Sequence, residues 1–319
     1  MGPSSKHFID DSDDVAHVPS EKRSGSQAGM QLALLNRKQL GSLIPEENMH
    51  VYQLKRDAFL ISALAILTSS LWAQDDLAKP SQNKLAKLTQ LPFQNNTTFG
   101  VGNEDAVVNV LNIQPVYPVT LGGINIINRA ILPVVYQGER FAGEGSKFGL
   151  GDLSYTGFLS PGEPGDVIWG IGPSLLLPTA TDDRLGTGKW SAGVGVVVLT
   201  LPGRWVIGVL AQNVWSVAGE DARGDVNRLL AQYFINYNLE NGWYLSSAPI
   251  ITANWKALSG SRWVVPVGGG VGKIFRLNGT PIDVQVQSFY NVEKPKGAGD
   301  WSTRLEFKLL FPKSGSGTR

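Results

Sequence analysis

The sequence predicts an all-β protein, a closed antiparallel transmembrane β-barrel of about 12 strands that follows a cleaved signal peptide and a short N-terminal helix. Three observations lead to this fold class. Turn residues divide the second part of the chain into runs of roughly ten residues. The connections between runs alternate between short and long, and several runs alternate apolar with polar side chains. Barrels of the bacterial outer membrane combine these three features.

The chain begins with a polar segment, residues 1–48, that shows no sustained hydrophobic period. We interpret it as a disordered leader or as a start assigned too far upstream. Residues 49–73 are predicted to be the signal peptide, because a Lys-Arg pair precedes an apolar run too short to span a membrane and the small residue Ala73 follows it. The alternative is a buried helix of a soluble domain.

Residues 74–94 are predicted to contain a short helix, because Leu85, Leu88 and Leu91 recur at three-residue spacing. The sequence leaves open whether this segment is periplasmic or lies in the lumen as a plug. The barrel itself is predicted over residues 95–312, and residues 313–319 are expected to be a tail.

Runs of strand-like sequence fill the predicted barrel region, and no helical pattern of comparable length separates them, which favours an all-antiparallel sheet. Short connections such as 120–123 and 202–204 alternate with longer, more charged ones such as 137–147 and 179–189. The approximate strands are 95–102, 107–118, 124–136, 148–159, 167–178, 190–201, 205–216, 227–238, 243–254, 262–275, 282–291 and 301–311.

Alternation within strands predicts which face meets lipid. In 301–311 and 282–291, aromatic and aliphatic residues share one face and charged or amide residues share the other. The runs 205–216 and 243–254 alternate poorly, which keeps a soluble fold open as an alternative. In a barrel the polar face lines the lumen. The candidate lumen residues are Arg129, Arg228, Gln232, Asn236, Asp283, Gln285, Gln287, Arg304, Glu306 and Lys308.

This mixed-sign lining argues against strong ion selectivity. Two arrangements of the charges are open: a polar wall around an aqueous path, or a ladder of cross-strand salt bridges that fills the barrel. A barrel of about 12 strands is in either case narrower than a sixteen-stranded porin.

Tryptophans gather at the ends of the predicted strands, where amphipathic rings form the two interfacial girdles of a barrel. The predicted girdle residues are Trp190, Trp205, Trp215, Trp243, Trp255, Trp263 and Trp301. The glycine-rich piece 268–273 lies within a strand, where we expect glycines to allow a bend or the close approach of a lumenal segment.

Composition excludes several classes of function. The chain is nearly neutral, with 28 Lys and Arg against 27 Asp and Glu, which disfavours nucleic acid as a partner. It has no cysteine, and all 3 histidines (His7, His17 and His50) precede the expected cleavage point. The usual general base and soft metal ligands are therefore missing from the predicted barrel. We expect no enzymatic activity, no catalytic residues, no cofactor and no metal site.

Long stretches carry a resemblance to a known family. WGIGPSLLLPTATDDRLGTGKWSAGVGVVVL (169–199), together with LPFQNNTTFGVG and NYNLENGWYLSSAPIITANW, resembles the bacterial outer-membrane family called "MetA-pathway of phenol degradation", whose relatives are often labelled transporter or neuromedin U. The likeness extends over residues 75–312. It implies a barrel in the bacterial outer membrane with a role in the passage of small molecules, aromatic compounds among them, and it supplies no catalytic residues.

The sequence thus predicts an outer-membrane channel or transporter for small molecules, hydrophobic or aromatic ones included. The alternative is a structural or surface ligand-binding protein without transport, and an outer-membrane enzyme is the least supported class. The expected partners are outer-membrane lipid, the barrel assembly machinery, which would recognise the terminal strand up to Phe311, and a small solute that the sequence does not name.

Overall fold

The computed structural model describes residues 75–312, so the predicted leader (1–48), signal peptide (49–73) and tail (313–319) lie outside the described residues. The described chain is a single antiparallel sheet preceded by the helix α3 (Asp75–Gln82). The strand segments are β1 (Thr89–Val101), β2 (Ala106–Ile113), β3 (Val116–Leu121), β4 (Ile124–Gln137), β5 (Lys147–Leu150), β6 (Leu153–Pro161), β7 (Val167–Leu177), β8 (Lys189–Thr200), β9 (Trp205–Gly219), β10 (Asn227–Asn238), β11 (Trp243–Ser247), β12 (Ile250–Asn254), β13 (Trp263–Leu277), β14 (Thr280–Glu293) and β15 (Trp301–Phe311).

The sheet closes on itself as a barrel of 12 antiparallel strands, which confirms the predicted fold class. Neighbours in sequence are neighbours in the wall, and the first strand pairs with the last, with Phe93 opposite Phe307. Closure matters in a membrane because an open edge would expose unpaired backbone groups to hydrocarbon.

Three of the membrane crossings are interrupted rather than continuous. β2 and β3 form one crossing, as do β5 with β6 and β11 with β12. Proline marks two of the interruptions, Pro115 and Pro249, because it lacks the N–H that a ladder needs. The prediction of unbroken strands over 107–118, 148–159 and 243–254 was therefore wrong at these points.

The start of the barrel differs from the sequence prediction. The helix ends at Gln82, and β1 begins at Thr89 rather than at residue 95. Leu85 and Leu88 lie in the connecting coil, and Leu91 lies in β1, so their three-residue spacing does not mark one helix. The pairing partner explains the longer strand, because β15 extends to Phe311, which lies opposite Thr89.

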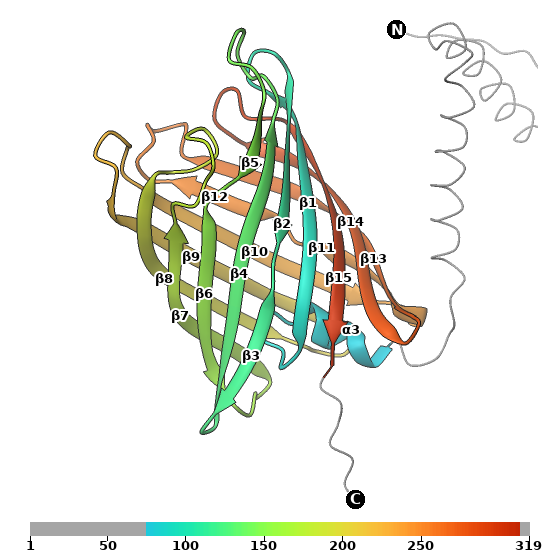
Figure 1. Cartoon of the computed structure of the whole chain (residues 1–319). Coiled ribbons are helices and arrows are strands. Elements are labelled where there is room, and N and C mark those ends of the chain that lie inside the picture. The colour runs from blue at the N-terminus through green and yellow to red at the C-terminus, as the bar shows by residue number, and fades with distance from the viewer. Residues whose placement is uncertain (1–74, 313–319) are drawn as a thin grey trace, which may run out of the picture. The chain divides into compact units, whose positions relative to one another are not determined.

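The two ends of the barrel are different (Figure 1). At one end, which we call the short-turn end, are short connections such as 122–123 between β3 and β4, together with α3 and the last residues of β15. The other end, the long-loop end, carries the connections 138–146, 178–188 and 220–226. In outer-membrane barrels short turns face the periplasm and long loops face the exterior.

The barrel is apolar outside and polar inside. Val286 and Leu305 expose 50% and 54% of their surface outward, whereas their neighbours Gln287 and Glu306 are buried inside at 1% and 8%. This inverts the arrangement of a soluble protein and suits a lipid surround. Together with the closed barrel it places the protein in the bacterial outer membrane. Within residues 75–312, no helix is both long and apolar enough to cross a membrane.

Candidate functional site

The predicted lumen residues lie on four strands and fall into two groups. Arg129 on β4, with Arg228 and Gln232 on β10, lines an open cavity in the lumen. The remaining seven are buried inside the barrel, and three of them, Asp283, Glu306 and Lys308, form a polar network nearer the short-turn end. The seven are Asn236, Asp283, Gln285, Gln287, Arg304, Glu306 and Lys308. The two arrangements left open by the sequence therefore coexist at different depths.

The centre of the polar network is Lys308. Its Nζ lies 3.0 Å from Asp283 Oδ2 and 3.1 Å from Glu306 Oε1. The Tyr244 hydroxyl donates to Asp283 Oδ1 over 2.6 Å, and Gln94 Nε2 donates to Glu306 Oε2 over 2.7 Å. Each carboxylate oxygen thus has a donor, which buried charges require.

Tyr244 was not among the predicted site residues because its strand alternates poorly. It lies against Gly272 of β13, where a Cβ atom would collide with the phenol ring. The glycine-rich piece 268–273 therefore does allow a close approach, here by the side chain of a neighbouring strand.

The break between β11 and β12 adds a backbone group to the lumen. The Ala248 carbonyl accepts hydrogen bonds from Gln232 Nε2 at 3.0 Å and from Arg304 Nη1 at 2.7 Å. Arg304 also donates through Nε to Asn96 Oδ1 at 2.9 Å and lies 4.9 Å from the Phe289 ring centroid. Proline at position 249 was the sequence signal that could have located this inward break.

Residues 77–88, which we call the plug, occupy the short-turn end of the lumen. Three polar contacts from different parts of the wall hold it. Lys79 Nζ donates to the Leu201 carbonyl at 3.1 Å, Gln82 Nε2 donates to Asn238 Oδ1 at 2.9 Å, and Lys308 Nζ donates to the Ser81 carbonyl at 3.2 Å. The sequence left the position of this segment open, and the structure places it inside the barrel.

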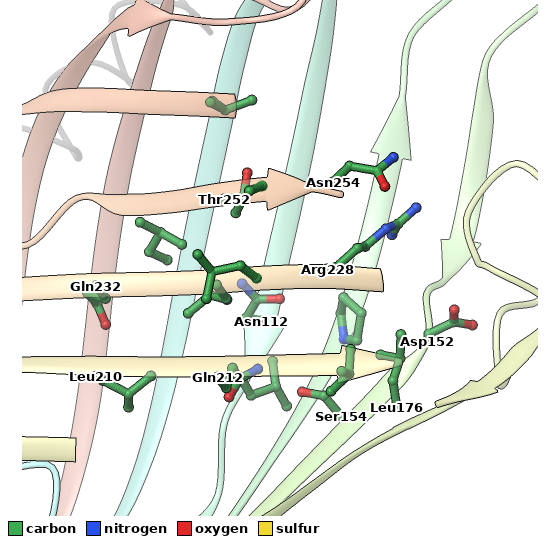
Figure 2. Close-up of a pocket in the computed structure, with 18 of the residues that line it drawn as sticks. Asn112, Asp152, Ser154, Leu176, Leu210, Gln212, Arg228, Gln232, Thr252 and Asn254 are labelled. Atoms are coloured by element: carbon green, nitrogen blue, oxygen red, sulfur yellow. The ribbon is translucent and has the colours of Figure 1, made fainter. Parts of the chain in front are cut away.

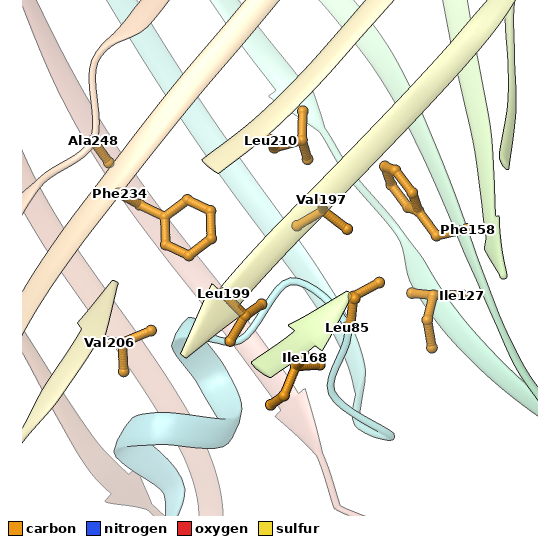
Figure 3. Packing of buried hydrophobic residues seen from close by; sticks show 10 residues of the cluster. All are labelled: Leu85, Ile127, Phe158, Ile168, Val197, Leu199, Val206, Leu210, Phe234 and Ala248. Carbon is orange, nitrogen blue, oxygen red and sulfur yellow. The ribbon is translucent and has the colours of Figure 1, made fainter. Parts of the chain in front are cut away.

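Leu85 of the plug is the apolar anchor (Figure 3). It is buried in a cluster formed by inward-facing residues of the wall: Ile127, Phe158, Ile168, Val197, Leu199, Val206, Leu210, Phe234 and Ala248. On β7, Gly170 leaves room for it, because a Cβ there would lie 3.0 Å from Leu85 Cδ2. Lys84 beside it lies 5.8 Å from the Phe234 ring centroid.

Above the plug the lumen opens into a cavity of about 540 Å³, which we call the main cavity (Figure 2). Arg228 and Asn254 lie toward one end of it, and Leu210 and Gln232 lie farther along the strands. A second cavity of about 370 Å³ shares the lining residues Ile250, Thr252 and Val264, so the two are adjoining parts of one lumen. Both amide and aliphatic side chains line the main cavity, which suits solutes with polar and apolar parts.

The loops at the long-loop end are joined by ion pairs. Glu144 lies 2.8 Å from Arg140 and 3.5 Å from Arg184, and Asp182 lies 2.7 Å from Lys147. Hydrogen bonding to the Arg140 guanidinium holds the pKa of the Glu144 carboxyl below its usual value, and the Lys147 ammonium does the same for the pKa of Asp182. These contacts connect the loop 138–146 with the loop 178–188.

The predicted girdle tryptophans all lie near strand ends. Trp190, Trp215, Trp255, Trp263 and Trp301 lie toward the long-loop end, whereas Trp205 and Trp243 lie toward the short-turn end. Trp169, near the start of β7 and 48% exposed, joins the second group and was not predicted. Cross-strand rings support the belts: the centroids of Trp255 and Trp263 are 5.3 Å apart, and those of Trp205 and Tyr237 are 4.6 Å apart.

The chain is similar to known proteins in structure. No family model matches the sequence, and no curated protein matches it. An outer membrane channel from Pseudomonas putida F1 has a similar structure, with a TM-score of 0.55 and 18% sequence identity over 70% of this chain and 94% of that one. At this identity the likeness shows the fold alone.

Two other solved structures are less similar. Outer membrane phospholipase A from Escherichia coli has 14% identity and a TM-score of 0.37, over 70% of this chain and 96% of that one. The toluene transporter TodX from Pseudomonas putida has 9% identity and a TM-score of 0.36, over 76% of this chain and 93% of that one. TM-scores this low show nothing about the function of the present chain.

The fold and the site together define a class, a twelve-stranded β-barrel of the bacterial outer membrane with a partly open lumen. The barrel agrees with the family resemblance noted in the sequence. Membership of the phenol-degradation family stays a prediction, because no family model matches.

Proposed function

We propose that the protein is a channel for small amphipathic molecules, with aromatic compounds among them, and that the plug controls its periplasmic end. The observation that carries this proposal is the combination of the main cavity of about 540 Å³ with a plug held mainly by a few side-chain contacts. Cavities of this size accommodate ligands of one or two rings.

The nature of the plug contacts supports a movable segment. The plug is not part of the sheet, so its displacement would break no strand pairing. Its contacts with the wall are side-chain hydrogen bonds, an exposed ion pair between Lys87 and Glu163, and apolar packing through Leu85 and Ala78. Local openings of such weakly attached segments cost much less free energy than global unfolding.

A structural or surface-binding role is the second candidate, and the joined long loops favour it. Ion pairs between Glu144, Asp182 and their basic neighbours give the loop surface a defined shape. Such a protein would leave the plug in place, and solute would not cross.

We propose transport rather than catalysis because no histidine or cysteine occurs in the barrel sequence. Hydrolytic sites generally use histidine to activate serine or water. Partners would be outer-membrane lipid around the apolar face, the barrel assembly machinery and the small solute.

The role of the assembly machinery has a simple test. Deletion of residues 301–311 removes β15, which pairs with both β14 and β1. We expect this variant to be absent from outer-membrane fractions, and normal membrane insertion would refute the proposed dependence on the terminal strand.

Transport is tested by solute flux through vesicles that contain the protein. Labelled phenylalanine and the larger trisaccharide raffinose are enclosed, and their release is followed with and without protein. The proposal predicts protein-dependent release of phenylalanine that exceeds that of raffinose and increases when residues 77–88 are deleted. If neither solute is released by the wild type or by the deletion variant, the surface-binding alternative is favoured.

A further inference from the structure

The main cavity has an excess of positive charge. Three of its lining residues are arginines, Arg129, Arg228 and Arg262, whereas Asp152 is its one acidic lining residue among the described part of the chain. A guanidinium stays charged at any physiological pH. The cavity therefore favours solutes that carry negative charge.

Among residues 75–312, Asp152 forms no ion pair with these arginines. Its Oδ2 accepts hydrogen bonds from the Thr187 backbone N–H at 2.6 Å and from the Thr187 hydroxyl at 2.7 Å. Its Oδ1 lies 3.3 Å from the Ala180 N–H, which donates to it. The carboxylate is thus engaged in holding the loop 178–188.

The carboxylate below the cavity is also engaged. Glu306 accepts from Gln94 through Oε2 and pairs with Lys308 through Oε1, at 2.7 Å and 3.1 Å. Arg129 instead donates from Nη2 to the neutral amide oxygen of Gln114 at 2.8 Å. A guanidinium has five N–H donors, and this hydrogen bond to a neutral acceptor uses one of those of Arg129.

Arg228 is the second guanidinium available to a solute. It lies at the long-loop end of β10, directly opposite Asn254, and Figure 2 shows the two side chains at the same end of the cavity. Within residues 75–312 it forms no ion pair. Arg129 lies nearer the short-turn end, because β4 begins there at Ile124.

Aliphatic side chains are part of the same cavity lining as these two guanidinium groups. Leu176, Leu210, Leu230 and Val264 line the same cavity. A ligand that fits both features has an apolar body and one anionic end. Carboxylate suits this role because a guanidinium binds it with two parallel hydrogen bonds.

From these contacts we infer that the main cavity binds small monoanions with an apolar body, of the arylalkyl carboxylate class. Arg228 is the first carboxylate site from the exterior, and Arg129 is the second, deeper site. The inference deepens the proposed function and rests on it for the direction of travel, whereas binding in the cavity can be measured without transport.

The test is equilibrium dialysis of the full-length protein in a non-ionic detergent with labelled 4-phenylbutyrate. Unlabelled 4-phenylbutanol and 4-phenylbutylamine serve as neutral and cationic competitors of the same shape. We expect saturable binding and about tenfold weaker competition by the alcohol, because a hydrogen bond to a charged group is worth about one factor of ten or more. Arg129→Gln and Arg228→Gln should each weaken binding by about tenfold.

The matched control is Arg276→Gln, at the short turn between β13 and β14, where its guanidinium donates to the Gly279 carbonyl. This variant should bind like the wild type. Equal competition by acid and alcohol, or unchanged binding by the double variant Arg129→Gln/Arg228→Gln in a protein that still shows heat-modifiable migration, would overturn the inference. Charge-selective binding without phenylalanine release from vesicles would support the site and contradict the channel.

Discussion

Lys308 and Asp283 lie directly opposite each other on β15 and β14, and Lys308 Nζ is 3.0 Å from Asp283 Oδ2 inside the barrel. Both side chains are buried, at 7% and 1% exposure. The same ammonium also contacts Glu306 and the Ser81 carbonyl of the plug. Lys308 therefore connects the wall of the barrel to residues 77–88.

Removal of the ammonium should destabilise the barrel strongly. Lys308→Met leaves Asp283 and Glu306 as neighbouring buried carboxylates without their counter-ion, and breaking a buried pair on one side costs about 3–5 kcal/mol. The free energy of unfolding in urea, followed by heat-modifiable migration, measures the loss. Lys87→Met is the control, because Lys87 forms an exposed pair with Glu163 and should change stability by less than about 1 kcal/mol. Equal effects of the two variants would contradict the role given to Lys308.

A larger side chain at position 170 should loosen the plug. Gly170→Val places atoms where Leu85 now lies, and overpacking of this kind costs about 1–3 kcal/mol. The chain has no cysteine, so a cysteine introduced at the buried position Leu88 reports on plug opening through its rate of maleimide labelling. We expect labelling to become about tenfold faster in the valine variant.

The matched control for this experiment is Gly165→Val, in the turn before β7. A Cβ at Gly165 meets nothing within 4 Å, so the labelling rate should not change. If both valine variants label at the wild-type rate, Leu85 is not what holds the plug.

The mobility of the long loops should change with pH only under acidic conditions. The pKa values of Glu144 and Asp182 are lowered in the folded protein, so their ion pairs contribute fully above the ordinary values of 4.5 and 3.8 and are lost as the pH falls through the lower, folded values. A spin label at Ser146 should show constant mobility from pH 8 to about 5 and increasing mobility below about 4. Glu144→Gln should increase mobility at neutral pH.

A spin label at Leu121, the last residue of β3, is the control for this titration. It lies at the opposite end of the barrel, far from the loop ion pairs. A rise in mobility near neutral pH at Ser146 would show that groups other than these carboxylates set the loop order.

Charge on the outer face should be costly. Val196 on β8 is 39% exposed and points outward, so Val196→Arg would place a guanidinium in hydrocarbon at a cost of about 2–4 kcal/mol. Leu258→Arg, in the loop after β12, is the control because Leu258 is 83% exposed outside the strands. Urea unfolding of barrels in lipid vesicles measures both changes. A tolerated arginine at 196 would argue against lipid contact there.

The sequence was sufficient for the fold and for the two faces of the regular strands. Alternation of period two is a local property, so Val286 and Gln287 could be assigned to opposite faces without knowledge of any partner strand. Where turn residues flank a run, the predicted strand bounds agree with the observed ones, as for β10 and β15. The inward break at Ala248 was not predicted, because Pro249 lies inside a run that otherwise has the length of one strand.

The site was harder to predict because its contacts join distant parts of the chain. Asp283 and Lys308 could be assigned to the lumen, but their pairing depends on the register between β14 and β15, which alternation limits only to every second residue. The spacing of Leu85 and Leu88 fits a helix as well as a coil. The structure shows coil, and Leu85 packs beside Gly170, a residue far away in sequence.

The central claim is that residues 77–88 close a lumen that is otherwise open enough for solutes. Single-channel conductance in planar bilayers tests it most directly, with the full-length protein compared with a variant that lacks residues 77–88 and with the Lys87→Ala control. We expect small or absent current steps for the wild type and the control, and large, stable steps for the deletion variant. Identical conductance in all three folded proteins would contradict it.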